Sequence, residues 1–270
     1  MNNNFQYKNI TLGSDPEFFI VNKKGKLVSS IGIIEGTKDR PQFLPALGKG
    51  FAIQTDNVLG EFNIPPSTTA HEATQNIAIM KAYITGFLSD KGLLPKYMAS
   101  AVYPTSELKS KEAKAFGCSV DYNAWTEMPN DKPCGEKTSL RSAGVHFHLG
   151  YDNHNTPASL NAIKAFDLFL GVPSVMIDPD NKRRQLYGKA GCFRLTRFGF
   201  EYRSMSGYFI SSNELTRWCF NQIFKAIDYL NEYGVSEILK DGELIQNAIN
   251  NGDKSIAEAL ITKYNINIKY

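Results

Sequence analysis

Two kinds of apolar spacing divide this chain, and the change between them near residue 213 limits the folds open to it. Before that point, short apolar runs alternate with glycine-containing turns, as where Phe18–Val21 is followed by a turn over 22–26 and then by Leu27 and Val28. Such runs predict strands joined by hairpins. After Asn213 the apolar residues recur at helical spacing, which predicts helices over 215–233, 235–250 and 255–264. Strands gathered in one part of a chain and helices in another are typical of the α+β class.

Two further helices are expected inside the strand-rich part. Thr69 and Glu72 have the spacing of a helix capping box, and apolar residues follow at helical spacing until Gly92. A second helix is expected over 156–171, and a long structured loop over 118–140. Because no internal repeat or linker interrupts the 270 residues, the sequence predicts one domain over 1–270, with a helical C-terminal segment over about 213–270.

Composition and charge exclude several classes of protein. Hydrophobic residues make up 42% of the chain, and 30 Lys and Arg stand against 27 Asp and Glu, a net charge of +3. That balance argues against a general nucleic-acid or membrane-surface protein. We find no signal peptide and no run of about 18 apolar residues, and the four cysteines are far apart. The sequence therefore predicts a cytoplasmic protein with reduced thiols, no membrane span and no general nucleic-acid binding.

Polar residues two positions apart recur within apolar surroundings. In a strand, residues i and i+2 share a face, so each pair is expected to project together. Taken alone, the acidic pairs are better interpreted as solvated strand residues, and the histidine pair fits buried structural histidines as well as it fits ligands. The pairs are Asp15 and Glu17, Glu61 and Asn63, His146 and His148, and Glu201 and Arg203.

Asp56 needs a separate argument because it stands an odd number of residues before Glu61. An unbroken strand would place the two carboxylates on opposite faces. A bulge at Gly60 would correct this, since glycine within a strand often marks a bulge. A turn acid followed by an exposed strand is the simpler alternative.

Considered together, these residues have one chemical meaning. Acids crowded on one sheet face are unfavourable unless a cation lies among them. Oxygen ligands with one histidine favour Mg²⁺ or Mn²⁺ over Zn²⁺. Arginines beside such ions suit a polyphosphate, and seven basic residues stand between Lys182 and Arg203 against one acid, Glu201. The sequence therefore predicts a nucleotide site with two or three metal ions in a sheet-lined funnel.

The same segments carry a resemblance to a known family. Their order resembles that of carboxylate–amine ligases of the glutamine synthetase-like fold, in particular the phage-type COOH–NH2 ligase (amidoligase) family. The resemblance covers about residues 11–210, the expected core, and leaves the C-terminal helices uncovered. It rests on Asp15-Pro16-Glu17-Phe18-Phe19, Gly60-Glu61-Phe62-Asn63, His146-Phe147-His148 and Glu201-Tyr202-Arg203, and on the segments 116–124 and 183–191.

The resemblance implies a fold, cofactors and roles. The fold would be a glutamine synthetase-like antiparallel β-sheet funnel with flanking helices, and the cofactors ATP and Mg²⁺, with Mn²⁺ as an alternative. The implied metal ligands are Asp15, Glu17, Asp56, Glu61, His146 and Glu201. The implied phosphate contacts are His148, Arg183, Arg184, Lys189 and Arg194, and the implied catalytic arginines are Arg194, Arg197 and Arg203. Asp121 in the long loop is a candidate for removing a proton from the amine.

These roles together predict an ATP-dependent ligase that joins a carboxylate to an amine through an acyl phosphate. Three alternatives stay open: a guanidino-kinase-like phosphotransferase on the same fold, a metal-dependent hydrolase using His146 and His148, and a binding protein without activity. The expected partners are a small-molecule or side-chain carboxylate and an amine. A homo-oligomer is possible through Trp218 and its neighbours, which are otherwise core residues. If the chain is phage-encoded, its expected location is the host cytoplasm.

Overall fold

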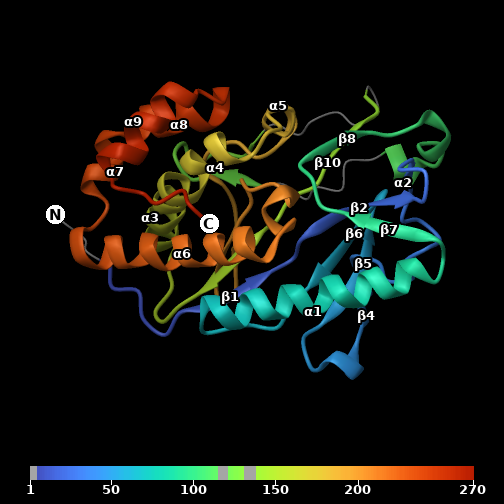
Figure 1. The fold of residues 1–270 in the computed structure, drawn as a ribbon. Coiled ribbons are helices and arrows are strands. Elements are labelled where there is room, and N and C mark those ends of the chain that lie inside the picture. The colour runs from blue at the N-terminus through green and yellow to red at the C-terminus, as the bar shows by residue number, and fades with distance from the viewer. Residues whose placement is uncertain (1–4, 115–120, 131–137) are drawn as a thin grey trace.

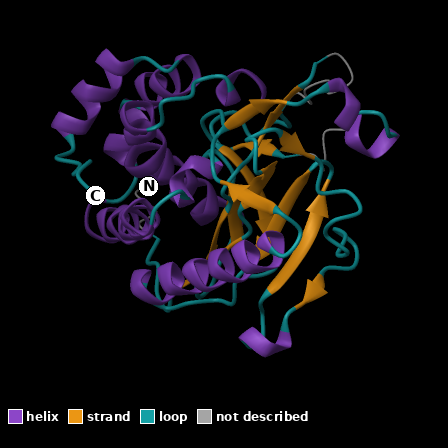
Figure 2. Ribbon diagram, turned by 45° about the vertical axis from the view of Figure 1, so that its right-hand side comes forward, coloured by secondary structure: helices purple, strands orange, loops and turns teal. Residues whose placement is uncertain are grey.

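The computed structural model describes residues 5–114, 121–130 and 138–270, and it separates strands from helices (Figures 1 and 2). All strand pairs are antiparallel, and the C-terminal part is helical, which confirms the predicted α+β class. Of the predicted loop over 118–140, residues 118–120 and 131–137 lie outside the described residues.

Two larger sheets make up the strand-rich part. The first has the strand order β1 (Thr11–Ser14), β11 (Phe147–Gly150), β13 (Gly199–Tyr202), β12 (Cys192–Thr196) and β9 (Tyr122–Asn123). The second has the order β3 (Leu27–Val28), β2 (Glu17–Asn22), β6 (Leu59–Asn63), β5 (Ala52–Asp56) and β4 (Gln42–Phe43), and β7 (Leu93–Lys96) also pairs with β2. A small third sheet pairs β10 (Leu140–Ser142) with β8 (Ser100–Val102).

The dipeptide Asp15-Pro16 connects the two larger sheets, because β1 ends just before it and β2 begins just after it. On one side, the backbone N–H of Glu17 donates to the carbonyl of Gly144 at 2.9 Å. On the other side, the N–H of Phe62 donates to the carbonyl of Pro16 at 3.1 Å. Backbone hydrogen bonds therefore continue on both sides of Asp15-Pro16, a connection that we call the step, and the two sheets form one curled surface.

Helix α1 (Ala70–Ser89) begins where the capping residues predict it. The Thr69 hydroxyl accepts a hydrogen bond from the backbone N–H of Glu72, and the Glu72 carboxylate accepts one from the N–H of Thr68 rather than Thr69. Gly92, at φ 71°, lies in the turn that follows the helix. The helix buries one apolar stripe, which includes Ile77 and Met80.

A continuous helical segment runs through the middle of the helical part. It consists of α3 (Thr156–Phe166), a π-helical turn (η4, Asp167–Gly171) and α4 (Val172–Ile177). The predicted end at Gly171 is wrong, because the segment continues through α4 to Ile177. A Cβ on Gly171 would lie 2.6 Å from Ile249 Cδ1 and 3.0 Å from the Tyr202 hydroxyl. That glycine allows close packing rather than ending the helix. The segment Thr156–Ile177 is long and apolar enough to cross a membrane, but 78% of its 18-residue apolar window is buried inside the protein, as in a core helix.

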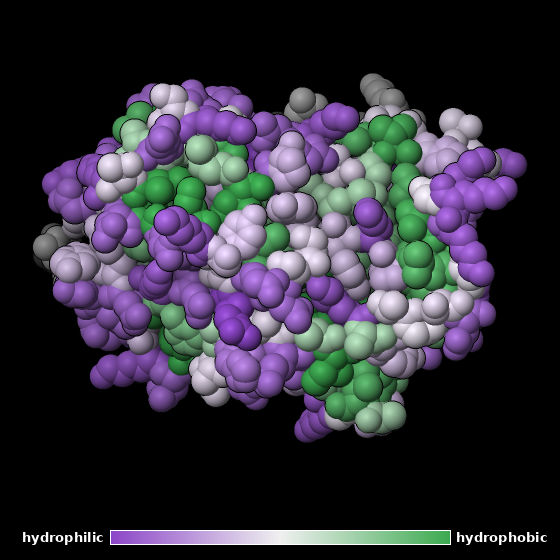
Figure 3. Space-filling model, in the orientation of Figure 1, coloured by the Kyte–Doolittle hydropathy of each residue, from purple (hydrophilic) through white to green (hydrophobic). Residues whose placement is uncertain are grey.

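The C-terminal segment contains α6 (Asn213–Tyr233), α7 (Ser236–Lys240), α8 (Gly242–Asn251) and α9 (Lys254–Lys263). The helix predicted over 235–250 is divided in two at Asp241. Helix α6 packs against α1 and α3, and its Phe220 ring contacts Phe147 of β11 edge-on at 5.3 Å. Its outer side is polar (Figure 3), since Arg217 and Lys225 are exposed there while Trp218 is buried as predicted.

Shorter elements complete the described part of the chain. They are η1 (Pro45–Leu47), η2 (Thr105–Glu107), α2 (Lys111–Lys114), α5 (Arg183–Leu186) and η5 (Gly207–Ile210).

Candidate functional site

A row of carboxylates crosses the sheet formed by β2, β6 and β5. Glu17 on β2 lies directly opposite Glu61 on β6, and Glu61 lies opposite Gln54 on β5. Directly opposed residues of an antiparallel pair project from the same face, and Asp56 shares that face because it stands two residues after Gln54. One ligand atom from each of Glu17, Asp56 and Glu61 lies within 4.8 Å of the others. We call these three residues the acid group.

Asp56 reaches this group without a bulge at Gly60, so of the two alternatives for Asp56 the bulge is wrong. Asp56 pairs with Leu59 across a two-residue hairpin turn, in which Asn57 adopts φ 55°. Asp56 and Glu61 therefore lie on different strands, and the parity of a single strand does not apply to them. Gly60 has another role, because a Cβ there would lie 2.2 Å from the Phe18 ring.

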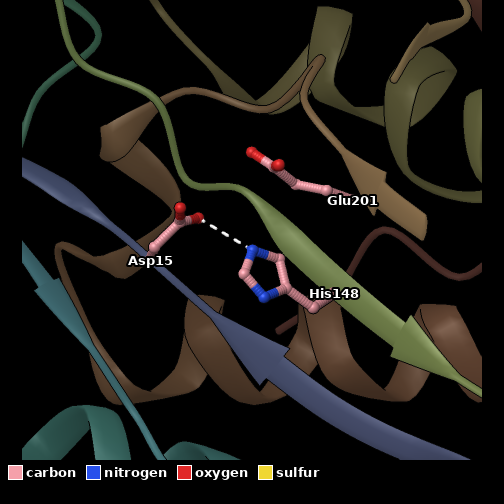
Figure 4. Close-up of side chains that lie close together, drawn as sticks. All are labelled: Asp15, His148 and Glu201. Atoms are coloured by element: carbon pink, nitrogen blue, oxygen red, sulfur yellow. Dashed lines mark hydrogen bonds and ion pairs between the residues drawn. The ribbon is translucent and has the colours of Figure 1, made fainter. Parts of the chain in front are cut away.

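A second row crosses the sheet formed by β11, β13 and β12. His148 lies opposite Glu201, and Glu201 lies opposite Arg194. His148 Nε2 is 3.1 Å from Asp15 Oδ1 (Figure 4). One ligand atom from each of Asp15, His148 and Glu201 lies within 4.8 Å of the others, and we call these residues the histidine group.

His146 lies beside the same carboxylates. Its Nδ1 is 3.2 Å from Asp15 Oδ1 and 3.4 Å from Glu201 Oε1, and the residue is buried. The sequence predicts His146 as the metal ligand and His148 as a phosphate contact. Since both rings contact Asp15, that division of roles stays a prediction.

The two groups differ in charge balance. Burial alone would raise the pKa of Asp15, but the charges of His148 and His146 and their hydrogen bonds hold it well below its usual range. In the acid group, burial and the neighbouring carboxylates raise the pKa of Glu61 well above its usual range. Burial and Glu17 raise the pKa of Asp56 to about 6. In the histidine group, the histidines therefore balance the negative charge of the carboxylates. The acid group contains no positively charged side chain of its own.

Lys38 supplies part of that charge, and our sequence interpretation missed it. Its ammonium lies 3.5 Å from Asp56 Oδ2. Burial lowers the pKa of Lys38, but Asp56, Glu61 and Glu17 outweigh burial and raise it. The backbone hydrogen bond from the Thr55 N–H to the Gly36 carbonyl, 2.7 Å long, docks this loop against β5. No motif around Lys38 indicates this contact, because it depends on how the loop packs.

The residues of both groups fit divalent metal ions. Oε2 of Glu61 is buried and has no hydrogen-bond partner in the described part of the chain. A buried carboxylate oxygen in that situation is strongly unfavourable unless a cation or proton is beside it. The acid group offers only carboxylate oxygens and the histidine group adds imidazole nitrogen, a donor set that suits Mg²⁺ or Mn²⁺.

Three arginines predicted for the site lie around it. Arg203 forms an ion pair with Glu201 through Nη1, and its Nε lies 3.6 Å from Asp121 Oδ2. Arg194 Nη1 lies 3.3 Å from Glu201 Oε2. Arg183 is buried, and its Nη1 and Nη2 donate to the backbone carbonyls of Ser204 and Arg203. Glu201 therefore orients two guanidinium groups at once.

The other three basic residues predicted for the site have other surroundings. Arg184 Nη2 donates to the Ser174 hydroxyl at 2.9 Å, and Lys189 is exposed. Arg197, implied to be a catalytic arginine, is exposed in the turn between β12 and β13, so its even spacing from Glu201 does not place the two on one strand face. The roles of Arg184 and Lys189 as phosphate contacts and of Arg197 as a catalytic arginine stay predictions.

A cavity, partly open to solvent, extends from the acid group toward the arginines. Asp121 lies in its wall and accepts a hydrogen bond from the Cys192 thiol, with Sγ 3.1 Å from Oδ2. Arg141 and Tyr187, which our sequence interpretation did not single out, also line it. The full lining is Glu17, Asp56, Asn57, Val58, Leu59, Asp121, Arg141, Ser142, His146, Arg183, Tyr187, Cys192 and Arg203.

Two solved structures are similar to this chain over most of its length. One is described as apo GmaS without ligand, with 14% identity and a TM-score of 0.44, over 95% of this chain and 69% of that one. The other is a bifunctional glutathione synthetase from Pasteurella multocida, with 10% identity and a TM-score of 0.41, over 95% of this chain and 49% of that one. No curated protein matches the chain in sequence.

One family model matches residues 136–269, a range that contains His146, His148, Glu201 and Arg203. The model describes the phage phiEco32-like COOH–NH2 ligases of type 2. The matched range supplies most of the histidine group and the arginines around it, and Asp15 and the acid group come from the chain before it. Through residues 136–269, this chain belongs to the phage phiEco32-like COOH–NH2 ligase family.

Proposed function

We propose that this protein is an ATP-dependent ligase of the glutamine synthetase-like fold that joins a carboxylate to an amine through an acyl phosphate, with Mg²⁺ or Mn²⁺ in the site. The observation that supports this most is the pair of ligand groups on one curled sheet face, beside arginines and a cavity. A ligase of this kind needs cations and guanidinium groups around a transferred phosphoryl group, and it needs space beside them for two further reactants.

The acid group would hold one metal ion, and Asp15 and Glu201 with His148 or His146 would hold another. Ions bound there would neutralise oxygens of the ATP phosphates. Sites held mainly by carboxylates on neighbouring strands are rigid, because each ligand is fixed by the sheet register. The ligand groups thus orient the nucleotide before the reaction begins.

The arginines act on the phosphoryl group in transfer. Glu201 holds Arg194 and Arg203 in place, so their charge is oriented before the reaction rather than during it. Arg183 Nε is buried and has no hydrogen-bond partner in the part of the chain described. A buried guanidinium with an unused donor favours an oxyanion beside it, either of the phosphoryl group or of the carboxylate substrate.

The first step transfers the γ-phosphoryl group of ATP to the substrate carboxylate, which forms a carboxyl–phosphate bond and releases ADP. The amine then attacks the acyl carbon, and inorganic phosphate leaves with the bonding electrons. A protonated amine cannot attack, so a base must take its proton. Asp121 suits this role because its carboxylate lies in the cavity wall, beside Arg203 and the Cys192 thiol.

An isotope experiment tests this chemistry directly. The purified chain is incubated with Mg²⁺, ATP, and mixtures of ¹⁸O-labelled carboxylates and amines. An acyl phosphate route transfers one ¹⁸O atom from the carboxylate to inorganic phosphate and yields ADP. Release of AMP and pyrophosphate, or unlabelled phosphate alongside an amide product, would overturn the proposal.

A further inference from the structure

Asp167 is a carboxylic acid in the middle of an otherwise apolar core. It is fully buried at the start of the π-helical turn, next to Leu168, Phe169 and Leu170. Its carboxylate accepts hydrogen bonds from the Trp125 indole N–H at 2.6 Å and from the Tyr202 hydroxyl at 2.8 Å. The backbone of Gly191 also hydrogen-bonds to it. Three donors from separate parts of the chain therefore converge on one side chain.

Each donor stands close in the chain to a residue of the site. Trp125 belongs to residues 121–130, which begin with Asp121 and which we call the tryptophan loop. Gly191 directly precedes Cys192, whose thiol donates to Asp121. Tyr202 stands between Glu201 and Arg203. Asp167 thus connects the loop that carries Asp121 to the strands that carry the arginines.

The described part of the tryptophan loop is also attached through the Ala124 N–H, which donates to the Gly191 carbonyl at 2.8 Å, and through Asp121, beside Arg203 and Cys192. It pairs with β12 over the two residues of β9, and its Tyr122 and Met128 are exposed. The Trp125 ring fits against two glycines, since a Cβ on Gly191 or on Gly242 would lie 2.7 Å or 2.6 Å from ring atoms. The ring is thus placed by contact, and its indole N–H is held by Asp167.

A carboxylate at this position contributes orientation rather than stability. Burial raises the pKa of Asp167 to about 7, against the opposing effect of the hydrogen bonds from Trp125, Tyr202 and Gly191. An apolar side chain of similar size would avoid that burial penalty and pack with its neighbours. What such a side chain cannot do is select one position for the indole and the hydroxyl, because it accepts no hydrogen bond.

We propose that Asp167 is a positioning residue that, through Trp125, holds the tryptophan loop and its Asp121 over the cavity. The proposal extends the proposed function by assigning a role to a side chain that touches no reactant. Its principal test is independent of that function.

Two cysteines offer a local measure of loop position. Cys192 is buried beneath Asp121, and Cys219 is buried in α6. They fall on different tryptic peptides, residues 190–194 and 218–225, so mass spectrometry reports the alkylation of each one separately. Opening of the loop exposes Cys192 alone, whereas general unfolding exposes both.

The experiment compares iodoacetamide labelling of wild type, Asp167→Leu, Trp125→Phe and Tyr202→Phe. Asp167→Leu and Trp125→Phe are expected to raise the labelling rate of Cys192 about tenfold, because each removes the loop's hydrogen bond to a charged group. Cys219 should stay at the wild-type rate. Tyr202→Phe removes only the hydrogen bond between Asp167 and strand β13. It should change the labelling rate of Cys192 by less than about twofold, since backbone hydrogen bonds to β11 and β12 hold β13 in place.

Two results would overturn the proposal. One is unchanged Cys192 labelling in both Asp167→Leu and Trp125→Phe. The other is an equal rise at Cys192 and Cys219, which would show that Asp167 maintains the whole core. Should Asp167→Leu fail to fold, Trp125→Phe decides the question, because it removes the N–H donor while a phenyl ring still fills part of the space of the indole.

Ligase kinetics add a readout that rests on the proposed function. In Trp125→Phe, kcat should fall about tenfold while KM for ATP stays within about twofold, because the nucleotide ligands do not lie on the loop. If the wild-type protein forms no ADP with any acid and amine, the proposed function fails. The labelling experiment still decides the role of Asp167.

Discussion

Glu17 and Glu61 face each other directly across strands β2 and β6, with both carboxylates on one side of the sheet. Directly opposed like charges destabilise a sheet, and here burial adds to the cost. The sheet therefore gives up stability at this pair in the absence of a cation.

Glu61→Gln should consequently stabilise the metal-free protein while it weakens metal binding. We expect the free energy of unfolding in EDTA to rise by about 1 kcal/mol, since a buried charge among like charges is removed. Urea denaturation measures the stability and calorimetric titration with Mn²⁺ measures the binding. The control is Glu35→Gln, a change at an exposed acid, which should alter neither. A less stable Glu61→Gln protein would contradict this account of the acid group.

The same carboxylates should be necessary for turnover. In Glu17→Ala, we expect ADP formation to fall at least about 100-fold, because a cation that neutralises phosphate oxygens is lost. Circular dichroism checks that the variant is folded. A folded Glu17→Ala protein with full ADP formation would remove the acid group from the proposed mechanism.

Lys38 should compete with metal ions for the acid group. Its ammonium, 3.5 Å from Asp56, neutralises charge that a bound cation would otherwise neutralise. Lys38→Met is therefore expected to raise the affinity for Mn²⁺ by about tenfold in the absence of nucleotide. Electron paramagnetic resonance of free Mn²⁺ measures this affinity, and Lys49→Met, at a residue that lines neither group, serves as the matched control. Weaker Mn²⁺ binding by Lys38→Met would instead show that the lysine helps to arrange the carboxylates.

Asp167 should make stability depend on pH. Its pKa in the folded protein is about 7, above the usual value of 3.8, so between these values the folded state holds a proton that the unfolded state has lost. The contribution to stability is therefore full below about pH 4 and is lost as the pH rises to about 7.

Between about pH 5 and pH 8, Asp167 alone should lower the free energy of unfolding by about 2–3 kcal/mol. Other site carboxylates and His148 also titrate, so the comparison is between wild type and Asp167→Asn at each pH. The free energy of unfolding of Asp167→Asn, relative to that of wild type, should increase as the pH rises. A difference that is constant with pH would mean that Asp167 keeps one protonation state throughout.

Strand parity made much of the site predictable from sequence. Residues two apart on one strand share a face whatever the rest of the protein does, and regular registers then bring Glu17 opposite Glu61 and His148 opposite Glu201. Capping chemistry likewise predicted the start of α1 at Thr69, because that interaction is local.

The errors occur where a residue's role depends on packing. In the sequence, Gly60 looks like a bulge and Gly171 looks like a helix end. Each position needs a glycine for another reason, because Phe18 packs against Gly60 and Ile249 packs against Gly171. Arg197 does not share a strand face with Glu201, because β12 ends one residue earlier, at Thr196, and the chain turns there. No sequence pattern around Lys38 predicts its contact with Asp56, since the two residues meet only when the loop that carries Lys38 packs against β5.

The step at Asp15-Pro16 has a consequence for the distance between the two ligand groups. One carboxylate before Pro16 serves the histidine group, and one after it serves the acid group. Two residues of extended chain span at most about 7 Å. The backbone at Asp15-Pro16-Glu17 would thus limit how far apart two cations held by these carboxylates could lie. An inserted residue would turn the second carboxylate to the other face, so that one ion would be lost rather than displaced.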